Sequence, residues 1–165
     1  MVLRGARQVG KTTVVNMFAK EFDHFIPLNL DVSSDRKIFS QASSVEDVIE
    51  ALFFLKGIPR RAEKRTLIFI DEIQKSPEAV ALLRYFFEKA PHLYVIAAGS
   101  LLETMLDKHI SFPVGRVEFL VLHPFSFEEF LSALGEKTTI EFFIKSPLQS
   151  MRKKNCLNYL NATYS

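Results

Sequence analysis

The stretch that decides the fold is Gly5-Ala6-Arg7-Gln8-Val9-Gly10-Lys11-Thr12, close to the start of a chain of 165 residues. Its pattern, G-x-x-x-x-G-K-T, is that of the phosphate-binding P-loop. Such a loop turns its backbone N–H groups inward toward an anion, and a glycine at each end permits backbone angles that a Cβ would forbid. The stretch and the following Thr13 therefore predict a phosphate site.

The residues after the loop predict a helix from Lys11 to about Phe22, with Val14, Val15, Phe18 and Phe22 on one face. Its positive N-terminus would face the phosphates. A lysine in the first helical turn is unfavourable for the helix dipole, and local rules are usually broken at functional sites. The alternative is an ordinary strand-to-helix turn with a solvated lysine.

The composition is that of an ordinary globular domain, with 48% hydrophobic and 24% charged residues. The length suits one domain with a core and is short for two. A net charge of +2 gives no support to a nucleic-acid partner, although such a partner stays possible. The single cysteine, Cys156, fits a reducing cytoplasm, and no run of 18 apolar residues predicts a membrane span.

Strands and helices are expected to alternate along the chain. Val2-Leu3 would end the first strand, and the further strands are expected at residues 25–30, 66–70, 93–98 and 117–122. Pro27 assigns the second of these to a sheet edge. Helices are expected from the Ser43/Glu46 capping box to Gly57, from Pro77 to Pro91, at residues 101–106, and from the Ser126/Glu129 capping box to Gly135. Residues 31–42 are expected to form a polar loop, with at most one helical turn at residues 36–39.

This order predicts an α/β domain with a mainly parallel sheet over residues 1–135, and residues 136–165 form a C-terminal extension. Ligands of such sheets bind at the carboxyl ends of the strands. Asp31, Asp71 and Ser100 are expected there, bordered by the loop with Arg116.

Two acids at the end of the apolar strand 66–70 suggest metal-assisted chemistry on a phosphate. Mg²⁺ takes few protein ligands, all hard oxygens, and Thr12 and Asp71 are the expected ones. Glu72 is placed to orient or deprotonate an attacking water. The alternative for Asp71-Glu72 is a strand that ends in two solvated acids.

Ser100 and Arg116 are weaker candidates. The Ser100 hydroxyl would lie beside the γ-phosphate if its strand separates the P-loop strand from the Asp71 strand, or it caps the next helix. Arg116 is a candidate for stabilising the transferring phosphate, from the same chain or from a neighbouring subunit. Arg7 touches phosphate or a partner, or it stays solvated.

Several motifs follow one another in a recognisable order: the loop at residues 5–13, Leu28-Asn29-Leu30-Asp31, the segment 70–77, Gly99-Ser100, Gly115-Arg116-Val117 and the segment 122–130. This series closely resembles the bacterial and archaeal AAA-type ATPases whose P-loop domain precedes a nuclease-like C-terminal domain of uncertain function. The resemblance covers about Met1 to Leu134. The family's helical segment before the first strand is missing, and from about Lys145 the residues no longer resemble it, so the chain looks like a truncated member.

The resemblance implies a three-layer P-loop NTPase fold with strand order 5-1-4-3-2, and ATP with Mg²⁺ as cofactors. By position, Gly5–Thr13 is the ATP-binding loop with the catalytic Lys11, Asp71 the Mg²⁺-associated acid and Glu72 the catalytic base.

The resemblance also covers two further residues. Ser100 corresponds to the γ-phosphate sensor and Arg116 to the glycine-arginine motif. Ala98 replaces a frequent threonine and removes one polar contact at the sensor. A homo-oligomer or the missing C-terminal domain is the expected partner.

The leading function is therefore ATP binding with Mg²⁺-dependent hydrolysis. One alternative is a nucleotide-binding fragment or interaction module that does not hydrolyse ATP. The other is a small-molecule kinase, which Glu72 beside Asp71 disfavours because it points to water as the acceptor.

Overall fold

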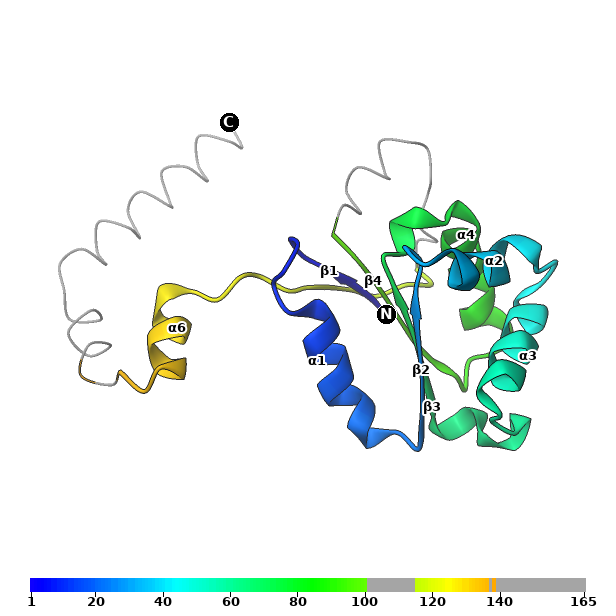
Figure 1. Ribbon diagram of the computed structural model, residues 1–165, viewed down its shortest axis with the longest axis horizontal. Coiled ribbons are helices and arrows are strands. Elements are labelled where there is room, and N and C mark those ends of the chain that lie inside the picture. Colours follow the sequence, from blue (N-terminus) through cyan, green and yellow to red (C-terminus); the bar gives the residue numbers. More distant parts are fainter. Residues whose placement is uncertain (101–114, 137, 139–165) are drawn as a thin grey trace. The chain divides into compact units, whose positions relative to one another are not determined.

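The computed structural model describes residues 1–100, 115–136 and 138 (Figure 1). The chain divides into two compact units, Met1–Pro124 and Phe125–Ser165. The first unit carries the sheet and the P-loop. The helix expected at residues 101–106 lies outside the described residues, as do residues 139–165 of the expected C-terminal extension.

The first unit is built on a five-stranded sheet in which every neighbouring pair is parallel. The strands run in the order β2-β3-β4-β1-β5, which confirms the predicted order read from the opposite edge. They are β1 (Val2–Arg4), β2 (His24–Asn29), β3 (Thr66–Asp71), β4 (Tyr94–Gly99) and β5 (Phe119–Val121). β2, which contains Pro27, is an edge strand as predicted.

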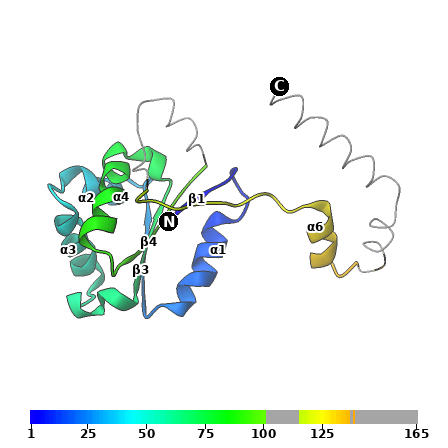
Figure 2. The ribbon, with the colours of Figure 1, turned by 180° about the vertical axis from the view of Figure 1, so that it is seen from behind.

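Helices cover both faces of this sheet. Figures 1 and 2 show α1 on one face, with α2, α3 and α4 on the other. The helices are α1 (Lys11–Phe18), α2 (Ser33–Gln41), α3 (Val45–Lys56) and α4 (Pro77–Lys89). Three short 3₁₀ helices each lie between a helix and a strand along the chain: η1 (Ala19–Glu21), η2 (Arg60–Arg65) and η3 (Ile73–Lys75). The predicted three-layer α/β arrangement is therefore confirmed.

The strand β3 divides its side chains between the two hydrophobic cores. Leu67 and Phe69 join the core that contains Val15 of α1, whereas Ile68 and Ile70 join the core beneath α2, α3 and α4. All four side chains are at most 2% exposed. This double burial explains why the strand is continuously apolar, as expected for a central strand of a parallel sheet.

Three local predictions need correction. The first helix ends at Phe18 and tightens into η1, where Phe22 N–H bonds to the carbonyl of Ala19 at 3.1 Å. Residues 33–41 form the helix α2, which is longer than the single turn expected within a loop, because Phe39 and Ile38 pack on the core and anchor a mostly polar segment. The capping box of α3 uses Ser44 and Asp47, one residue later than expected.

The described part of the second unit contains α6 (Phe127–Ala133). Ser126 caps it, because its hydroxyl accepts from Glu129 N–H at 3.2 Å while the Glu129 carboxylate accepts from Ser126 N–H at 2.7 Å. This confirms the second predicted capping box. None of the helices in the described ranges has the length and apolar character to cross a bilayer.

We expect Gly5→Ala to lower the free energy of unfolding by about 3 kcal/mol or more, through steric overlap and backbone strain. Gly5 has a φ of +149°, and an added Cβ would lie 2.3 Å from the Leu122 carbonyl oxygen. Gly57→Ala is the control, because Gly57 also has a positive φ, +63°, but has no atom within 4 Å of an added Cβ. Urea unfolding of both variants measures the difference, and equal losses would contradict the steric argument.

Candidate functional site

The P-loop joins β1 to α1 through three residues with positive φ. These are Gly5, Gln8 at +63° and Gly10 at +93°. Gly10 is the N-cap of α1 and provides no side-chain cap, so the first N–H groups of the helix are left for a ligand. The loop therefore has the backbone form that anion-binding nests require.

Lys11 lies inside this loop, with only 7% of its surface exposed. Its ammonium group donates to the carbonyl oxygens of Gly5 at 2.9 Å and Ala6 at 2.7 Å. A buried ammonium needs such acceptors because desolvation is costly. The loop thus keeps a positive charge next to its own N–H groups.

The end of β3 brings hard oxygen atoms to the start of α1. The Thr12 hydroxyl donates to Asp71 Oδ2 at 2.7 Å, and the other carboxylate oxygen of Asp71 accepts from Glu72 N–H at 2.9 Å. Among the described residues, no group of three or more His, Cys, Asp or Glu side chains is placed to hold a metal ion. Two oxygens beside a phosphate loop nevertheless suit Mg²⁺, which usually keeps several waters and binds through one or two carboxylates and substrate phosphates.

These groups share one cavity of about 490 Å³, a size typical of ligand sites. It is lined by Arg7, Gln8, Gly10, Lys11, Thr12, Thr13, Asp31, Asp71 and Glu72. Gly5 and Ala6 contribute to the site through their carbonyl oxygens, which accept from Lys11. Val9 lies close to the start of the loop, because its Cγ2 is 3.1 Å from where a Cβ added at Gly5 would stand.

Sequence reasoning expected Asp31 at this end of the sheet without giving it a role, and it gave no role to Gln74, which does not line the cavity. Asp31 lines the cavity and forms an ion pair with Lys75 of η3 at 3.1 Å. Gln74, also on η3, donates from its side-chain amide to Glu72 Oε2. The available signal for Asp31 was its position at the end of β2, and Gln74 gave none beyond its place two residues after Glu72.

Ser100 lies where the predicted strand order required. It follows Gly99, which pairs with Arg4 at the end of β1, and β4 separates β1 from β3. Its hydroxyl is buried and has no hydrogen-bond partner in the described part of the chain. It does not line the cavity, so the structure brings it near the predicted site without placing it in the site.

Arg116 is separated from the phosphate loop by the length of β1. It precedes β5, whose Phe119 pairs with Val2 at the start of β1, whereas Gly5 follows the other end of that strand. The connection that leaves the carboxyl end of β4 reaches the amino end of β5 at Arg116, so this residue itself does not lie at the carboxyl ends of the strands. A phosphate-stabilising role within the same chain is not supported by this placement.

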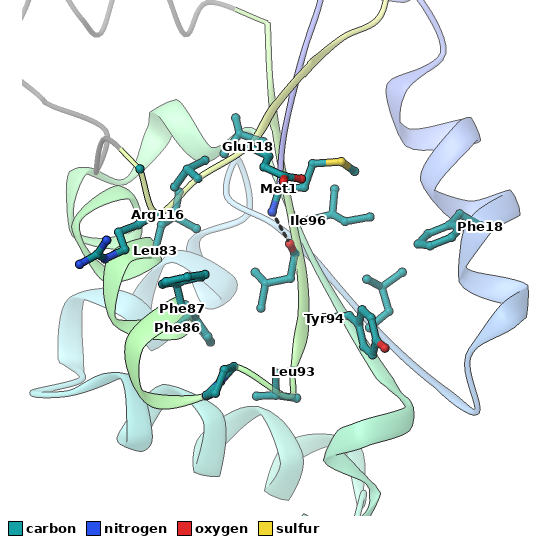
Figure 3. A pocket seen from close by; sticks show the side chains of 17 residues that line it. Met1, Phe18, Leu83, Phe86, Phe87, Leu93, Tyr94, Ile96, Arg116 and Glu118 are labelled. Carbon is teal, nitrogen blue, oxygen red and sulfur yellow. Dashed lines mark hydrogen bonds between the residues drawn. The ribbon is translucent and has the colours of Figure 1, made fainter.

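Arg116 lines a second, mainly apolar cavity of about 780 Å³ (Figure 3). Its guanidinium lies 5.7 Å from the centre of the Phe87 ring and donates to Glu88 at 3.3 Å. Hydrogen bonds from Arg84 and, more weakly, from Arg116 hold the pKa of Glu88 below its ordinary value. In the same cavity the Met1 ammonium donates to the Val95 carbonyl at 3.0 Å, and burial lowers the pKa of that ammonium.

In the comparison with protein families, residues 1–131 match a family described as an AAA domain. The search of curated proteins finds no match for this chain. The family match covers β1, the P-loop, Asp71 and Glu72.

Proposed function

The chain belongs to the AAA domain family, and on that premise we propose that it binds ATP at the P-loop cavity and hydrolyses it with Mg²⁺. The observation that carries this proposal is the 2.7 Å bond between the Thr12 hydroxyl and Asp71, in the cavity that Lys11 and Glu72 also line. A phosphate loop, two hard oxygens and a further carboxylate are the parts that phosphoryl transfer to water requires.

The loop would bind the β- and γ-phosphates of ATP. Its N–H groups and the N-terminus of α1 supply partial positive charge, and Lys11 supplies a full one. Thr12 and Asp71 would hold Mg²⁺, which when bound neutralises negative charge on the phosphates. Because Lys11 is buried in the loop, its charge acts with reduced screening by water.

Glu72 is the proposed general base. Glu72 lines the cavity, one residue beyond Asp71, the proposed ligand of Mg²⁺. It would accept a proton from the water that attacks the γ-phosphorus, as the bond to the β–γ bridging oxygen breaks and ADP and phosphate form.

Ser100 and Arg116 are also assigned roles in this proposal, each on a different structural observation. The partnerless Ser100 hydroxyl follows β4, between the P-loop strand and the Asp71 strand, which supports a contact with the γ-phosphate after a small shift. Arg116 lies at the amino ends of the strands, whereas the phosphate loop lies at their carboxyl ends. It would therefore stabilise the phosphate of a neighbouring subunit in a homo-oligomer.

The test is phosphate release from ATP in the absence of any other acceptor. We expect release in Mg²⁺ and none in EDTA, and we expect Asp71→Asn to raise the Mg²⁺ concentration for half-maximal rate by about tenfold or more, since it removes a charged metal ligand. Asp23→Asn is the matched control, because Asp23 is exposed, pairs only with Arg65 among the ion pairs of the described residues, and does not line the cavity.

Each other outcome favours a different function. ATP binding without phosphate release at any protein concentration would favour a nucleotide-binding module. Release that requires an added hydroxyl compound would favour a kinase. An unchanged Mg²⁺ requirement in the Asp71 variant would contradict the metal site.

A further inference from the structure

We propose that Gln74 is a positioning residue for Glu72, holding one carboxylate oxygen so that the other faces the water that attacks ATP. This inference rests on the proposed hydrolysis. It assigns a role to a side chain that neither lines the cavity nor belongs to the phosphate loop.

The contact itself is specific. The side-chain amide Nε2 of Gln74 donates to Glu72 Oε2, and within the described residues the other carboxylate oxygen, Oε1, takes part in no hydrogen bond. Glu72 lines the cavity but Gln74 does not. The amide therefore holds one oxygen from outside the cavity and leaves one acceptor for a ligand or water.

The backbone at Glu72 is fixed by other groups, so the side chain is what Gln74 can orient. Glu72 has a φ of +53°, and its N–H donates to Asp71 Oδ1 while its carbonyl accepts from Lys75 N–H, both at 2.9 Å. Ile73, between the two partners, is fully buried and anchors η3. With the main chain held, the hydrogen bond from Gln74 restricts the remaining side-chain rotations of the carboxylate.

The carbonyl oxygen of the Gln74 amide makes this arrangement unfavourable in free energy. Gln74 Oε1 is buried and has no hydrogen-bond partner in the described part of the chain. An unsatisfied buried acceptor costs about 1–3 kcal/mol. An apolar side chain of similar length would avoid this cost, so packing alone does not explain an amide here, whereas orientation of the adjacent base does.

The test is a double-mutant cycle of Gln74→Met and Glu72→Gln, read as kcat at saturating Mg²⁺-ATP and as the Kd for ATP. We expect Gln74→Met to lower kcat by about tenfold, since small displacements of catalytic groups have effects of this order or larger, and to leave the Kd within about twofold. In the Glu72→Gln background we expect no further loss from Gln74→Met, because the group that Gln74 positions is already gone.

Two controls separate positioning from folding. Methionine nearly preserves the length of the side chain and removes the partnerless acceptor, so the Tm of Gln74→Met should not fall. Gln41→Met, the same change at an exposed residue ending α2, should leave kcat and Tm unchanged.

The contrary outcomes are distinct. Equal loss of kcat in both backgrounds, or a higher kcat in Gln74→Met, would overturn the role of Gln74 while leaving ATP hydrolysis intact. A wild-type chain that binds ATP but releases no phosphate would instead overturn the proposed hydrolysis, and the role of Gln74 with it.

Discussion

Replacement of Lys11 by alanine is expected to raise the Kd for ATP by about a hundredfold. Lys11 is 7% exposed and is held in the loop by the carbonyls of Gly5 and Ala6. Hydrogen bonds to charged groups contribute about 1.5–3 kcal/mol each, and about 1.4 kcal/mol changes an equilibrium constant tenfold. The variant would lose an ammonium that is already desolvated and oriented before ATP arrives, so no compensating group is available.

The matched control is Lys20→Ala, which removes an exposed lysine from η1, shortly after the same helix. Calorimetric titration with Mg²⁺-ATP should give the wild-type Kd for this variant. A Lys11→Ala variant that binds ATP as tightly as the wild type, with an unchanged far-UV circular dichroism spectrum, would show that the loop does not hold the phosphates through this side chain.

Glu72→Gln is expected to bind ATP with an unchanged Kd and to lower kcat by about 10²–10⁴-fold, the range for general-base catalysis. The substitution keeps the shape of the side chain and removes its capacity to accept a proton. The contact between Asp71 and Thr12 does not involve the Glu72 side chain, so the metal site should be retained.

Single-turnover release of labelled phosphate measures this effect without interference from product release. Glu50→Gln, on the exposed surface of α3, is the matched control and should hydrolyse ATP at the wild-type rate. Wild-type phosphate release in Glu72→Gln would mean that another group deprotonates the water, and the assignment of the base would be wrong.

The sheet order followed from the sequence because three kinds of evidence agreed. The P-loop motif defined β1 and α1, continuous apolar runs identified β3 and β4, and the family resemblance supplied the order that no local pattern contains. Pro27 correctly assigned β2 to an edge, where a missing N–H costs little.

The path of the backbone at the site could not be predicted in the same way. Gln8 and Glu72 both have positive φ although neither is glycine. Tertiary contacts impose this conformation, which costs about 1–3 kcal/mol per residue at such positions, and propensity rules predict the opposite. The contact between Gln74 and Glu72 depends on that unusual backbone, so it was not visible either.

Two other failures have simple physical causes. The length of α2 was underestimated, as one turn within a loop, because polar residues dominate the segment and buried Phe39 is its chief apolar anchor. Arg116 was expected near the carboxyl ends of the strands because its loop begins there, after β4, whereas the residue itself stands at the other end of that loop, where the chain enters β5.

The loop that binds phosphate is mechanically joined to the last residues of the first unit. The backbone carbonyl of Arg4 accepts a hydrogen bond from Leu122 N–H at 2.8 Å. Any side chain at Gly5 would collide with the Leu122 carbonyl oxygen. Leu122 lies two residues before the unit ends at Pro124. Tension in the chain at Pro124 would therefore reach Arg4 and the first residue of the phosphate loop directly through Leu122, without first passing along β5.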